Sequence, residues 1–339
     1  MVKAMIESLL KGETLSEEKA EELMEQMMEG NVSNEHIASL LTIMRYREET
    51  VDEITGFARA MKKKSLSIDH DMTDLLDTCG TGGDGSNTFN ISTAAALVVS
   101  SLGVPVAKHG NRSVSSKTGS ADVLEQLGVP IQASKPEAEA MLESVGLTFL
   151  YAPIYHSAMK HVAPARKELG VKTIFNVLGP LTNPANANRQ IVGVYGFKEA
   201  RKMAEAAKRL GTKRALFLTG YDGLDECSIA KPTSIVELAN GEISMYDIAP
   251  EDVGLERGSI EDCTVFTSEE SASLIEGIFS HEARQAAIDI VKLNAACALY
   301  VYDRCETIAE GVHLAAKALK ERRVHEHLQM IRKFKEAVS

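Results

Sequence analysis

The sequence has no paired cysteines and no histidine cluster. Its five cysteines are scattered without a C-x-x-C pair, which argues against both a disulfide framework and a zinc cluster. Among the nine histidines, the closest pairs are His156 with His161 and His325 with His327, and neither pair has the i, i+4 spacing of a helical zinc site. We therefore expect reduced thiols and no transition metal.

A long apolar run is also missing. The longest apolar stretch, residues 94–107, is interrupted by two serines, Gly103 and Pro105, and falls short of the ~20 uninterrupted residues that a membrane helix needs. Residues 1–26 turn acidic where a secretory leader would have an apolar core and a small-residue cleavage site. These absences predict a cytoplasmic protein with no membrane partner.

The sequence has fewer basic residues than acidic residues. Lys and Arg total 37 against 48 Asp and Glu, which gives a formal net charge of -11. Such a charge repels polyanions, so we expect neither nucleic acid nor anionic lipid as a partner. At 339 residues with 44% hydrophobic content, the chain can form two domains with ordinary cores. Any anion must be bound by a local arrangement of groups.

The first 65 residues predict helices. Ser16 precedes an acidic first turn as an N-cap, and Thr50 with Glu53 forms a capping box. Apolar residues recur at helical spacing, for example at Leu23 and Met27. Short helices of this kind need one another, or a second subunit, to bury their apolar stripes.

From residue 74 the pattern changes to alternating strands and helices. Strands are expected at DLLDT, VPVA, QIVGVYG, RALFLTG and SIVEL, and the helix ISTAAALVVSSLG follows the first glycine loop. This alternation indicates a mostly parallel sheet whose ligands lie at the carboxyl ends of the strands. A proline-rich polar segment between Pro153 and Pro184 interrupts the pattern, and we expect it to return to the N-terminal helices.

The fold class that follows is α/β. We predict a small N-terminal α-helical domain and a large α/β domain with a mostly parallel central sheet flanked by helices. The helical domain spans residues 1–68 and is completed by a crossing segment at about 160–190. The α/β domain spans residues 72–159 and 190–339, and its last part, from Glu282, is mainly helical.

The glycine-rich stretch GTGGDGSNTFNIST, residues 80–93, is the strongest local signal. It matches the dinucleotide pattern G-x-G-x-x-G from Gly80. A Rossmann site, however, needs an acidic residue ~20 positions later, and none occurs between Asp84 and Asp122. No Gly-Lys-Ser/Thr closes the run as in a Walker A loop. Both common nucleotide-binding loops are therefore set aside.

What remains is a general phosphate-binding device. Glycines let backbone N–H groups approach a phosphate, and Asn90, Ser92 and Thr93 add donors at the start of a helix. A second loop, after the next predicted strand, is rich in basic, amide and hydroxyl residues: Lys108, Asn111, Arg112, Ser115, Ser116, Lys117 and Ser120. Two adjacent anion sites suggest a ligand that is phosphorylated at two ends. The alternatives are a tight turn for the first loop and a solvated surface for the second.

An acidic pair follows another predicted strand. We expect Asp225 and Glu226 to reach the same edge of the sheet as the glycine loop. At an effective dielectric of about 20, two like unit charges ~4 Å apart repel by about 4 kcal/mol, more than the ~0.3 to 1 kcal/mol that a helix terminus contributes. A cation must therefore intervene, and Mg2+ is suited to carboxylates combined with phosphates. The alternative is a turn whose acids face solvent.

Four long blocks carry a resemblance to a known family. They are GTGGDGSNTFNIST, KHGNRSVSSKTGSADVLEQLG, FLYAPIYHSAMKHVAPARKELGVKTIFNVLGPLTNPA and DGLDE. In this order, and over nearly the whole chain, the sequence resembles the anthranilate phosphoribosyltransferases. The resemblance implies transfer of the 5-phosphoribosyl group of phosphoribosyl pyrophosphate to the amino nitrogen of anthranilate, with release of pyrophosphate, in tryptophan biosynthesis. It also implies an architecture shared with the pyrimidine nucleoside phosphorylases.

The resemblance further implies a set of site residues. Phosphoribosyl pyrophosphate is expected at Gly80, Gly83, Asp84, Thr88, Asn90, Ile91, Ser92, Thr93, Lys108, Asn111, Arg112, Ser115, Ser116 and Ser120. Anthranilate is expected at Gly80, His109, Asn111, His156, Arg166 and Gly179. Magnesium, as two ions, is expected at Ser92, Asp225 and Glu226. Transition-state support is expected from Lys108, Arg166 and Asp84, with no single essential acid or base.

A homodimer through the N-terminal helices is expected from their apolar stripes and from the resemblance. Two other functions stay open. A pyrimidine nucleoside phosphorylase would carry a lysine just before its glycine motif, where this chain has Thr78 and Cys79. A non-catalytic nucleic-acid-binding relative on the same fold is opposed by the net charge of -11.

Overall fold

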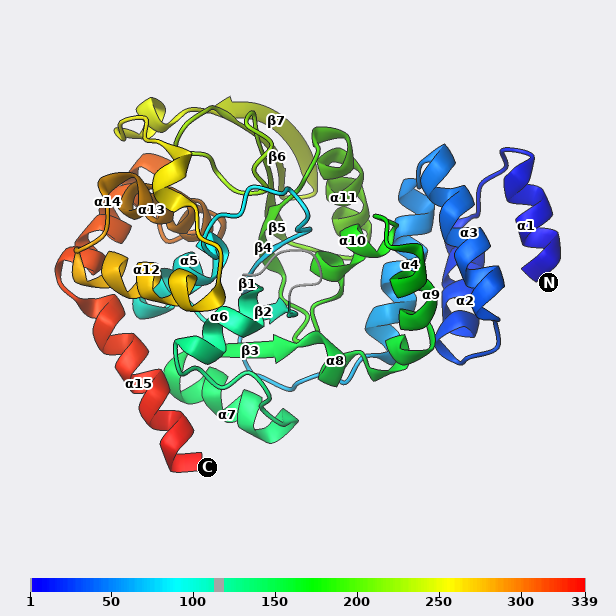
Figure 1. Cartoon of the computed structure of the whole chain (residues 1–339), viewed down its shortest axis with the longest axis horizontal. Coiled ribbons are helices and arrows are strands. Elements are labelled where there is room, and N and C mark those ends of the chain that lie inside the picture. The colour runs from blue at the N-terminus through cyan, green and yellow to red at the C-terminus, as the bar shows by residue number, and fades with distance from the viewer. Residues whose placement is uncertain (1, 113–118, 339) are drawn as a thin grey trace.

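The computed structural model describes residues 2–112 and 119–338, and Ser115 and Ser116 of the predicted phosphate site lie outside them. Figure 1 shows two parts: a group of helices at the N-terminal end (blue) and a larger part built around a sheet. None of the helices in the described ranges has the length and apolar character of a membrane span.

The N-terminal part consists of α1 (Val2–Leu10), α2 (Glu17–Met28), α3 (Asn34–Arg47) and α4 (Val51–Lys64). The predicted caps are confirmed: the hydroxyl of Ser16 accepts from a backbone N–H of the first turn of α2, and Thr50 and Glu53 form the capping box of α4. The buried carboxylate of Glu53 also accepts from the N–H of Leu15 at 3.0 Å and pairs with Arg47. One side chain thus joins the end of α3, the start of α4 and the segment before α2.

The sheet contains seven strands in the order β3-β2-β1-β4-β5-β6-β7. They are β1 (Leu76–Gly80), β2 (Val106–Gly110), β3 (Leu147–Tyr151), β4 (Arg189–Gly193), β5 (Arg214–Gly220), β6 (Thr233–Ala239) and β7 (Glu242–Ile248). The strands from β3 to β5 in this order pair in parallel, whereas β6 and β7 add antiparallel pairs. The prediction of a mostly parallel sheet is confirmed.

Strand β1 marks the point where the strand order reverses. From β1 the chain crosses to β2 on one side, and it later returns to β4 on the other side. The register pairs Gly80 with Gly193, so β1 and β4 end side by side. At such a switch point, the crevice outside the carboxyl ends of the strands accepts ligands. The glycine loop begins at this crevice.

Helices cover both faces of the sheet (Figure 1). On one face lie α5 (Ile91–Ser101) and α13 (Gln285–Val301); α11 (Phe197–Arg209) lies on the other face, where it also packs on α4. The remaining helices are α6 (Ser120–Gln126), α7 (Lys135–Val145), α8 (Ala152–Tyr155), α9 (Ala163–Leu169), α10 (Phe175–Leu178), α12 (Ser268–Ser280), α14 (Ile308–Lys320) and α15 (Arg323–Val338). Short 3-10 helices are η1 (Ser157–His161), η2 (Gly179–Thr182), η3 (Pro250–Val253) and η4 (Ile260–Cys263). Phe217 of β5 shares one hydrophobic cluster with Phe57 of α4, so the two parts share a core.

The segment 157–182 packs on the N-terminal helices. In this segment, η1 contacts α2, α9 contacts α3, and both α10 and η2 contact α4. The rings of Phe57 on α4 and Phe175 on α10 have centroids 6.4 Å apart. In Figure 1 this green segment lies against the blue helices. A segment from the middle of the chain therefore extends the N-terminal part.

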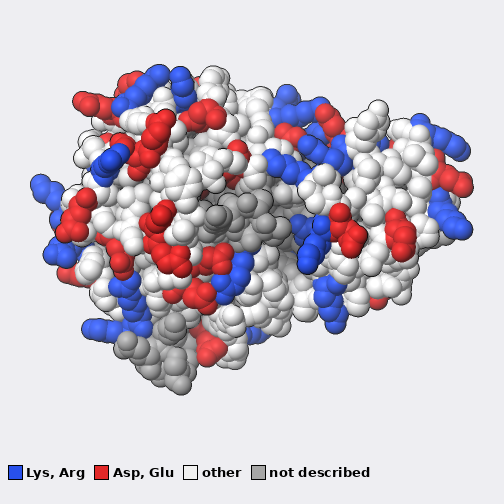
Figure 2. All heavy atoms as spheres, viewed as in Figure 1, with Lys and Arg blue, Asp and Glu red and all other residues white. Residues whose placement is uncertain are grey.

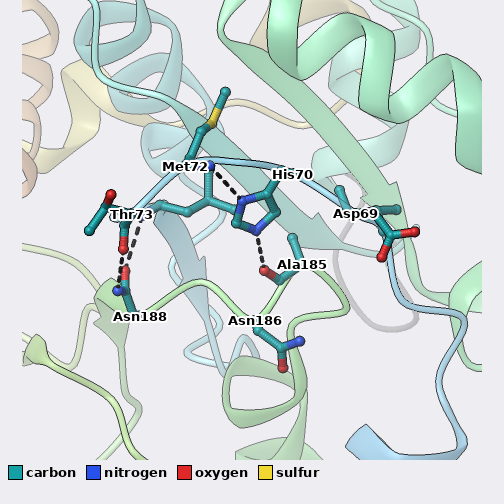
Figure 3. Close-up of a pocket in the computed structure, with 9 residues that line it drawn as sticks. Asp69, His70, Met72, Thr73, Ala185, Asn186 and Asn188 are labelled. Carbon is teal, nitrogen blue, oxygen red and sulfur yellow. Dashed lines mark hydrogen bonds between the residues drawn. The ribbon is translucent and has the colours of Figure 1, made fainter.

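Two linkers, residues 65–75 and 183–188, join the parts at the amino ends of β1 and β4. A cavity of about 310 Å³ lies between them, and Figure 3 shows its lining residues, among them Asp69 and Asn188. His70 joins the two linkers, because Nδ1 accepts from the N–H of Met72 at 3.2 Å and Nε2 donates to the carbonyl of Ala185 at 2.9 Å. This cavity lies at the end of the strands opposite to the glycine loop and is separate from the predicted site.

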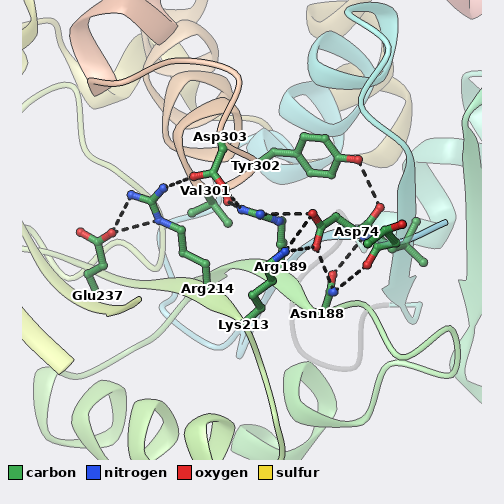
Figure 4. A network of polar contacts seen from close by, with 11 residues as sticks. Asp74, Asn188, Arg189, Lys213, Arg214, Glu237, Val301, Tyr302 and Asp303 are labelled. Atoms are coloured by element: carbon green, nitrogen blue, oxygen red, sulfur yellow. Dashed lines mark hydrogen bonds and ion pairs between the residues drawn. The ribbon is translucent and has the colours of Figure 1, made fainter. Parts of the chain in front are cut away.

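A polar network holds the same amino ends (Figure 4). Asp74 pairs with Arg189 at 3.2 Å and with Lys213 at 2.9 Å. Asp303, after α13, pairs with Arg189 at 2.6 Å and also with Arg214. Arg189 is buried, so loss of its acidic partners would leave an uncompensated charge in the interior. The network thus holds the starts of β1, β4 and β5 against the end of α13.

Gly56 of α4 lies where α4 packs on α2. A Cβ built there would be 2.2 Å from the carbonyl oxygen of Glu17 and 2.8 Å from the Cβ of Ala20, so the two helices would have to separate. Helix propensity favours alanine over glycine by about 1 kcal/mol, whereas overpacking costs about 1–3 kcal/mol and occasionally more. The difference between these two contributions predicts that Gly56→Ala lowers the free energy of unfolding by up to about 2 kcal/mol, as measured by urea denaturation.

Gly277 of α12 provides a matched control. A Cβ there meets Ala283 at 3.8 Å, an ordinary contact. Gly277→Ala should therefore be neutral, or should raise the free energy of unfolding by up to about 1 kcal/mol. Equal shifts of the urea midpoint in the two variants would contradict the close packing of α2 on α4.

Candidate active site

The acidic turn after β5 lies against the ends of β1 and β4. The carboxylate of Asp225 accepts a hydrogen bond from the N–H of Gly82 at 2.8 Å. A Cβ at Gly193 would lie 1.6 Å from the carbonyl oxygen of Asp225, and a Cβ at Gly80 would lie 3.1 Å from its carboxylate. The turn fits because neither glycine has a side chain. The structure thus brings the glycine loop and the acidic pair together.

The glycine loop is shaped by its glycines and by Asp84. Gly82, Gly83 and Gly85 have φ values of 64°, 78° and 74°, which residues with side chains rarely adopt. Asp84 folds onto the loop, where it accepts from the N–H of Ser86 at 3.3 Å and from its hydroxyl at 2.5 Å. The loop is therefore a tight turn, and it lies at an edge of the sheet where parallel strands commonly accept ligands.

The second half of the loop is held by a distant part of the chain. Thr88 forms an isolated bridge with Thr264, just after η4. The N–H of Asn90 donates to the hydroxyl of Ser271 on α12 at 3.0 Å. Neither partner was predicted, because no local pattern links residues so far apart in the sequence. These contacts fix the point at which the loop enters α5.

Helix α5 begins directly after the loop. The side-chain oxygen of Asn90 accepts from the N–H of Thr93 at 3.1 Å and from the hydroxyl of Ser92 at 3.3 Å. The N-terminus of a helix concentrates N–H groups and a partial positive charge, which favour anions. The side chain of Ile91 is buried in the core, so only its backbone can reach a ligand.

Lys108 ties β2 to β1 and to the start of α5. Its ammonium donates to the carbonyl of Thr78 and, at 3.1 Å, to the hydroxyl of Ser92. The residue is only 3% exposed, and burial lowers the pKa of Lys108 even though Asp77 attracts the charge. The sequence predicted a cation in the loop, whereas the structure buries this ammonium at β2, where it is bonded to Thr78 and Ser92.

The surroundings of Asp225 and Glu226 disfavour the charged forms of both carboxyl groups. Burial, followed by the charge of Asp84, raises the pKa of Asp225, and burial, followed by the charge of Asp225, raises the pKa of Glu226. The charge of Lys108 and a hydrogen bond from the N–H of Ser92 act to lower the pKa of Glu226. In the part of the chain that the structure describes, no three His, Cys, Asp or Glu side chains form a complete metal ligand set. The two carboxylates suit a cation that takes its other ligands from elsewhere.

The described part of the basic loop is already paired. Arg112 forms ion pairs with Asp122 at 2.6 Å and with Glu125 at 2.9 Å, both on α6. The carbonyl of Asn111 accepts from the hydroxyl of Ser120 at 3.3 Å. The sequence pattern gives no sign of this neutralisation of Arg112 by α6. This loop therefore presents less free positive charge than its composition suggests.

Two buried histidines hold the turn at Gly179. His109 donates from Nδ1 to the carbonyl of Gly179 at 3.1 Å, and His156 donates from Nε2 to the carbonyl of Thr182 at 3.0 Å. The centroids of the two rings lie 5.0 Å apart. Burial lowers the pKa of His109 to about 3 and that of His156 to about 4. Both rings are therefore neutral at pH 7 and serve as hydrogen-bond donors.

Arg166 lies near the same turn. Its guanidinium is 4.7 Å from the ring centroid of Phe175 on α10, the helix that leads into Gly179. Arg166 forms no ion pair with a carboxylate in the described ranges. A guanidinium that stacks on a ring without being neutralised can pair with an incoming carboxylate.

One further side chain reaches the site without having been predicted. Lys172, between α9 and α10, approaches Gly83 of the glycine loop. Its surroundings in the sequence contain ordinary polar and apolar residues, and no motif distinguishes it from the other lysines of that segment. Only the folded chain reveals this contact.

Comparisons with known proteins agree with both parts of the chain. Residues 3–65 match the family model described as the glycosyl transferase family, helical bundle domain, and residues 72–322 match its a/b domain. An anthranilate phosphoribosyltransferase of Geobacillus thermodenitrificans is 54% identical over 332 residues, which make up 98% of each chain.

Solved structures agree with the sequence matches. Anthranilate phosphoribosyltransferase from Thermus thermophilus has a TM-score of 0.91 at 40% identity, over 97% of this chain and 98% of that one. The enzyme from Saccharomyces cerevisiae, in complex with PRPP and Mg, also has a TM-score of 0.91, at 26% identity, over 99% of this chain and 98% of that one. The similarity therefore extends over the helices and the sheet together.

Proposed function

The chain belongs to the anthranilate phosphoribosyltransferase family, and from this premise we propose how its own residues carry out the reaction. It is a glycosyltransferase that joins the 5-phosphoribosyl group of phosphoribosyl pyrophosphate to the amino nitrogen of anthranilate, in tryptophan biosynthesis. Family membership does not favour the pyrimidine nucleoside phosphorylase or the nucleic-acid-binding alternative.

A single observation carries our assignment of the site residues. The hydrogen bond between Asp225 and Gly82 joins the acidic turn to the glycine loop at the switch point of the sheet. We assign the diphosphate to the crevice between this loop, the start of α5 and the acidic turn. The N–H of Gly83 can then serve as a donor, assisted by the partial positive charge at the start of α5, whereas the N–H groups of Ser92 and Thr93 already act on Glu226 and Asn90.

The remaining assignments follow the two loops. Residues proposed to complete the phosphoribosyl pyrophosphate site are Gly80, Asp84, Thr88, Asn90, Ile91, Lys108, Asn111, Arg112, Ser115, Ser116 and Ser120. Of these, Arg112 must exchange at least part of its pairing with α6 to bind a phosphate. Lys108 orients Ser92 through the hydrogen bond to its hydroxyl. Asp84 holds the glycine loop in shape by accepting from the N–H of Ser86.

The donor set fits magnesium. Asp225, Glu226 and the hydroxyl of Ser92 offer oxygen atoms only, and Mg2+ typically takes one or two carboxylates together with substrate phosphates and water. The yeast relative was solved with PRPP and Mg, which supports the same cofactor for this chain. We propose two ions, held by Ser92, Asp225 and Glu226 together with the diphosphate.

The chemistry requires no nucleophile from the protein. Loss of pyrophosphate from C1 of the ribosyl group gives oxocarbenium character, so the barrier falls when the departing oxygens are stabilised and the amine is held in line. Magnesium supplies part of that stabilisation by neutralising the departing oxygens. For anthranilate we assign Gly80, His109, Asn111, His156, Arg166 and Gly179. Within this set Arg166 pairs with the carboxylate of the substrate, while His109 and His156 keep the Gly179 turn in place.

A homodimer through the N-terminal helices is part of this proposal. Leu10 on α1 is 68% exposed and Tyr46 on α3 is 91% exposed, and the two helices contact each other. A second subunit would cover these apolar side chains. Light scattering at micromolar concentration should give the mass of two chains, and the mass of one chain would contradict the dimer. We further propose a cytoplasmic location, as expected for an enzyme of amino-acid biosynthesis.

An activity assay tests the function. Purified protein is mixed with anthranilate, phosphoribosyl pyrophosphate and Mg2+, and the loss of anthranilate fluorescence is followed. The signal should fall only when all three are present. Phosphorolysis of thymidine or uridine without any loss of fluorescence would move the assignment to the phosphorylases.

The same assay tests the metal assignment. Asp225→Asn and Glu226→Gln each remove one negative charge at nearly constant size. A charge-assisted contact contributes about 1.5–3 kcal/mol, so the Mg2+ concentration at half-maximal rate should rise roughly 10- to 100-fold. Glu256→Gln alters an exposed acid elsewhere, and this control should leave the Mg2+ concentration at half-maximal rate unchanged. A wild-type magnesium dependence in both site variants would show that these carboxylates do not hold the metal.

A further inference from the structure

The side chain of Lys172 reaches from the helical part of the structure to the glycine loop. It belongs to the segment that packs on the N-terminal helices. A Cβ at Gly83 would nevertheless lie 2.9 Å from the Cε of Lys172 and 3.4 Å from its Nζ. On the face drawn in Figure 2, basic side chains (blue) lie on the helical side of the hollow between the two parts. The tip of Lys172 is thus in contact with the loop that we assign to the diphosphate.

An aromatic ring holds this ammonium in place. Nζ of Lys172 lies 4.0 Å from the ring centroid of Tyr195, well within the range of a cation–π contact. Tyr195 is itself tied to the loop, because its N–H donates to the hydroxyl of Thr81 at 3.2 Å. The N–H of Thr81 donates in turn to the carbonyl of Gly193 at 2.8 Å. The ring therefore forms part of the rim of the site, and it fixes the lysine at that rim.

The positive charge of Lys172 is not neutralised. Within residues 2–112 and 119–338 it forms no ion pair, although the chain carries a net charge of -11. An aromatic face attracts an ammonium without cancelling its charge. Two other described cations near the glycine loop are engaged, since Lys108 is buried and bonded to Ser92, and Arg112 is paired with α6. A charge kept available at a phosphate loop calls for a functional explanation.

We propose that Lys172 binds the diphosphate of phosphoribosyl pyrophosphate from the helical side, opposite the N–H groups of the glycine loop. The inference rests on the proposed function and adds a residue to its site. An ammonium on a flexible stem is suited to phosphate oxygens, and the absent side chain of Gly83 leaves room for the two to meet. Each part of the molecule thereby contributes a contact to the same leaving group.

The position of Lys172 in the chain gives the contact a second consequence. Lys172 follows Arg166 by six residues on one segment. A diphosphate that binds Lys172 therefore also fixes the segment whose Arg166 pairs with anthranilate. In this way the first substrate helps to position the partner of the second.

Separate probes for the two ends of the substrate test the proposal. Lys172→Met keeps the length of the side chain and removes its charge, while Lys172→Arg keeps the charge. In Lys172→Met we expect the KM for phosphoribosyl pyrophosphate and the inhibition constant of pyrophosphate to rise together, by roughly 10- to 100-fold. Binding of ribose 5-phosphate should stay at the wild-type value, and Lys172→Arg should restore most of the lost affinity. Lys167→Met, which alters an exposed lysine on α9, serves as the control and should match the wild type.

Two outcomes would overturn the proposal. One is an unchanged affinity for pyrophosphate in Lys172→Met. The other is an equal loss of affinity for pyrophosphate and ribose 5-phosphate, which would mean that the lysine only joins the two parts. Failure of the proposed function would appear differently, as a wild-type protein that binds pyrophosphate but does not consume anthranilate.

Discussion

The hydrogen bond from the N–H of Gly82 to the carboxylate of Asp225 is the contact on which the site depends. It joins the loop after β1 to the turn after β5, although β4 separates these strands in the sheet. The turn can cross the end of β4 only because Gly193 has no side chain, since a Cβ there would lie 1.6 Å from the carbonyl oxygen of Asp225. One backbone donor and one missing side chain thus bring Asp225 and its neighbour Glu226 to the glycine loop.

This arrangement concentrates like charges in a protein that is already acidic. The pKa values of Asp225 and Glu226 are raised by burial and by neighbouring carboxylates, and the buried ammonium of Lys108 compensates only in part. In the proposed site, binding of a cation together with an anion would recover the free energy that this repulsion costs. Under the proposed function, a chain with a net charge of -11 binds a highly charged sugar through local donors and metal rather than through the overall field.

The sequence predicted the features that local physics decides. The caps at Ser16 and Thr50 require only the next turn of the chain, and the place of the glycine loop follows from the alternation of strands and helices. Strands β3 and β7 were not predicted: β3 is a short apolar run directly after Gly146 at the end of α7, and β7 is largely exposed. The pairing of Arg112 with α6 and the approach of Lys172 to Gly83 depend on tertiary packing, which no periodicity encodes.

The most direct test of this account is an experimental structure of the protein with phosphoribosyl pyrophosphate and Mg2+ bound. The account predicts diphosphate oxygens within hydrogen-bonding distance of the glycine-loop N–H groups, and metal between those oxygens and the carboxylates of Asp225 and Glu226. A sugar bound elsewhere, or carboxylates that touch neither metal nor a metal-bound water, would contradict it.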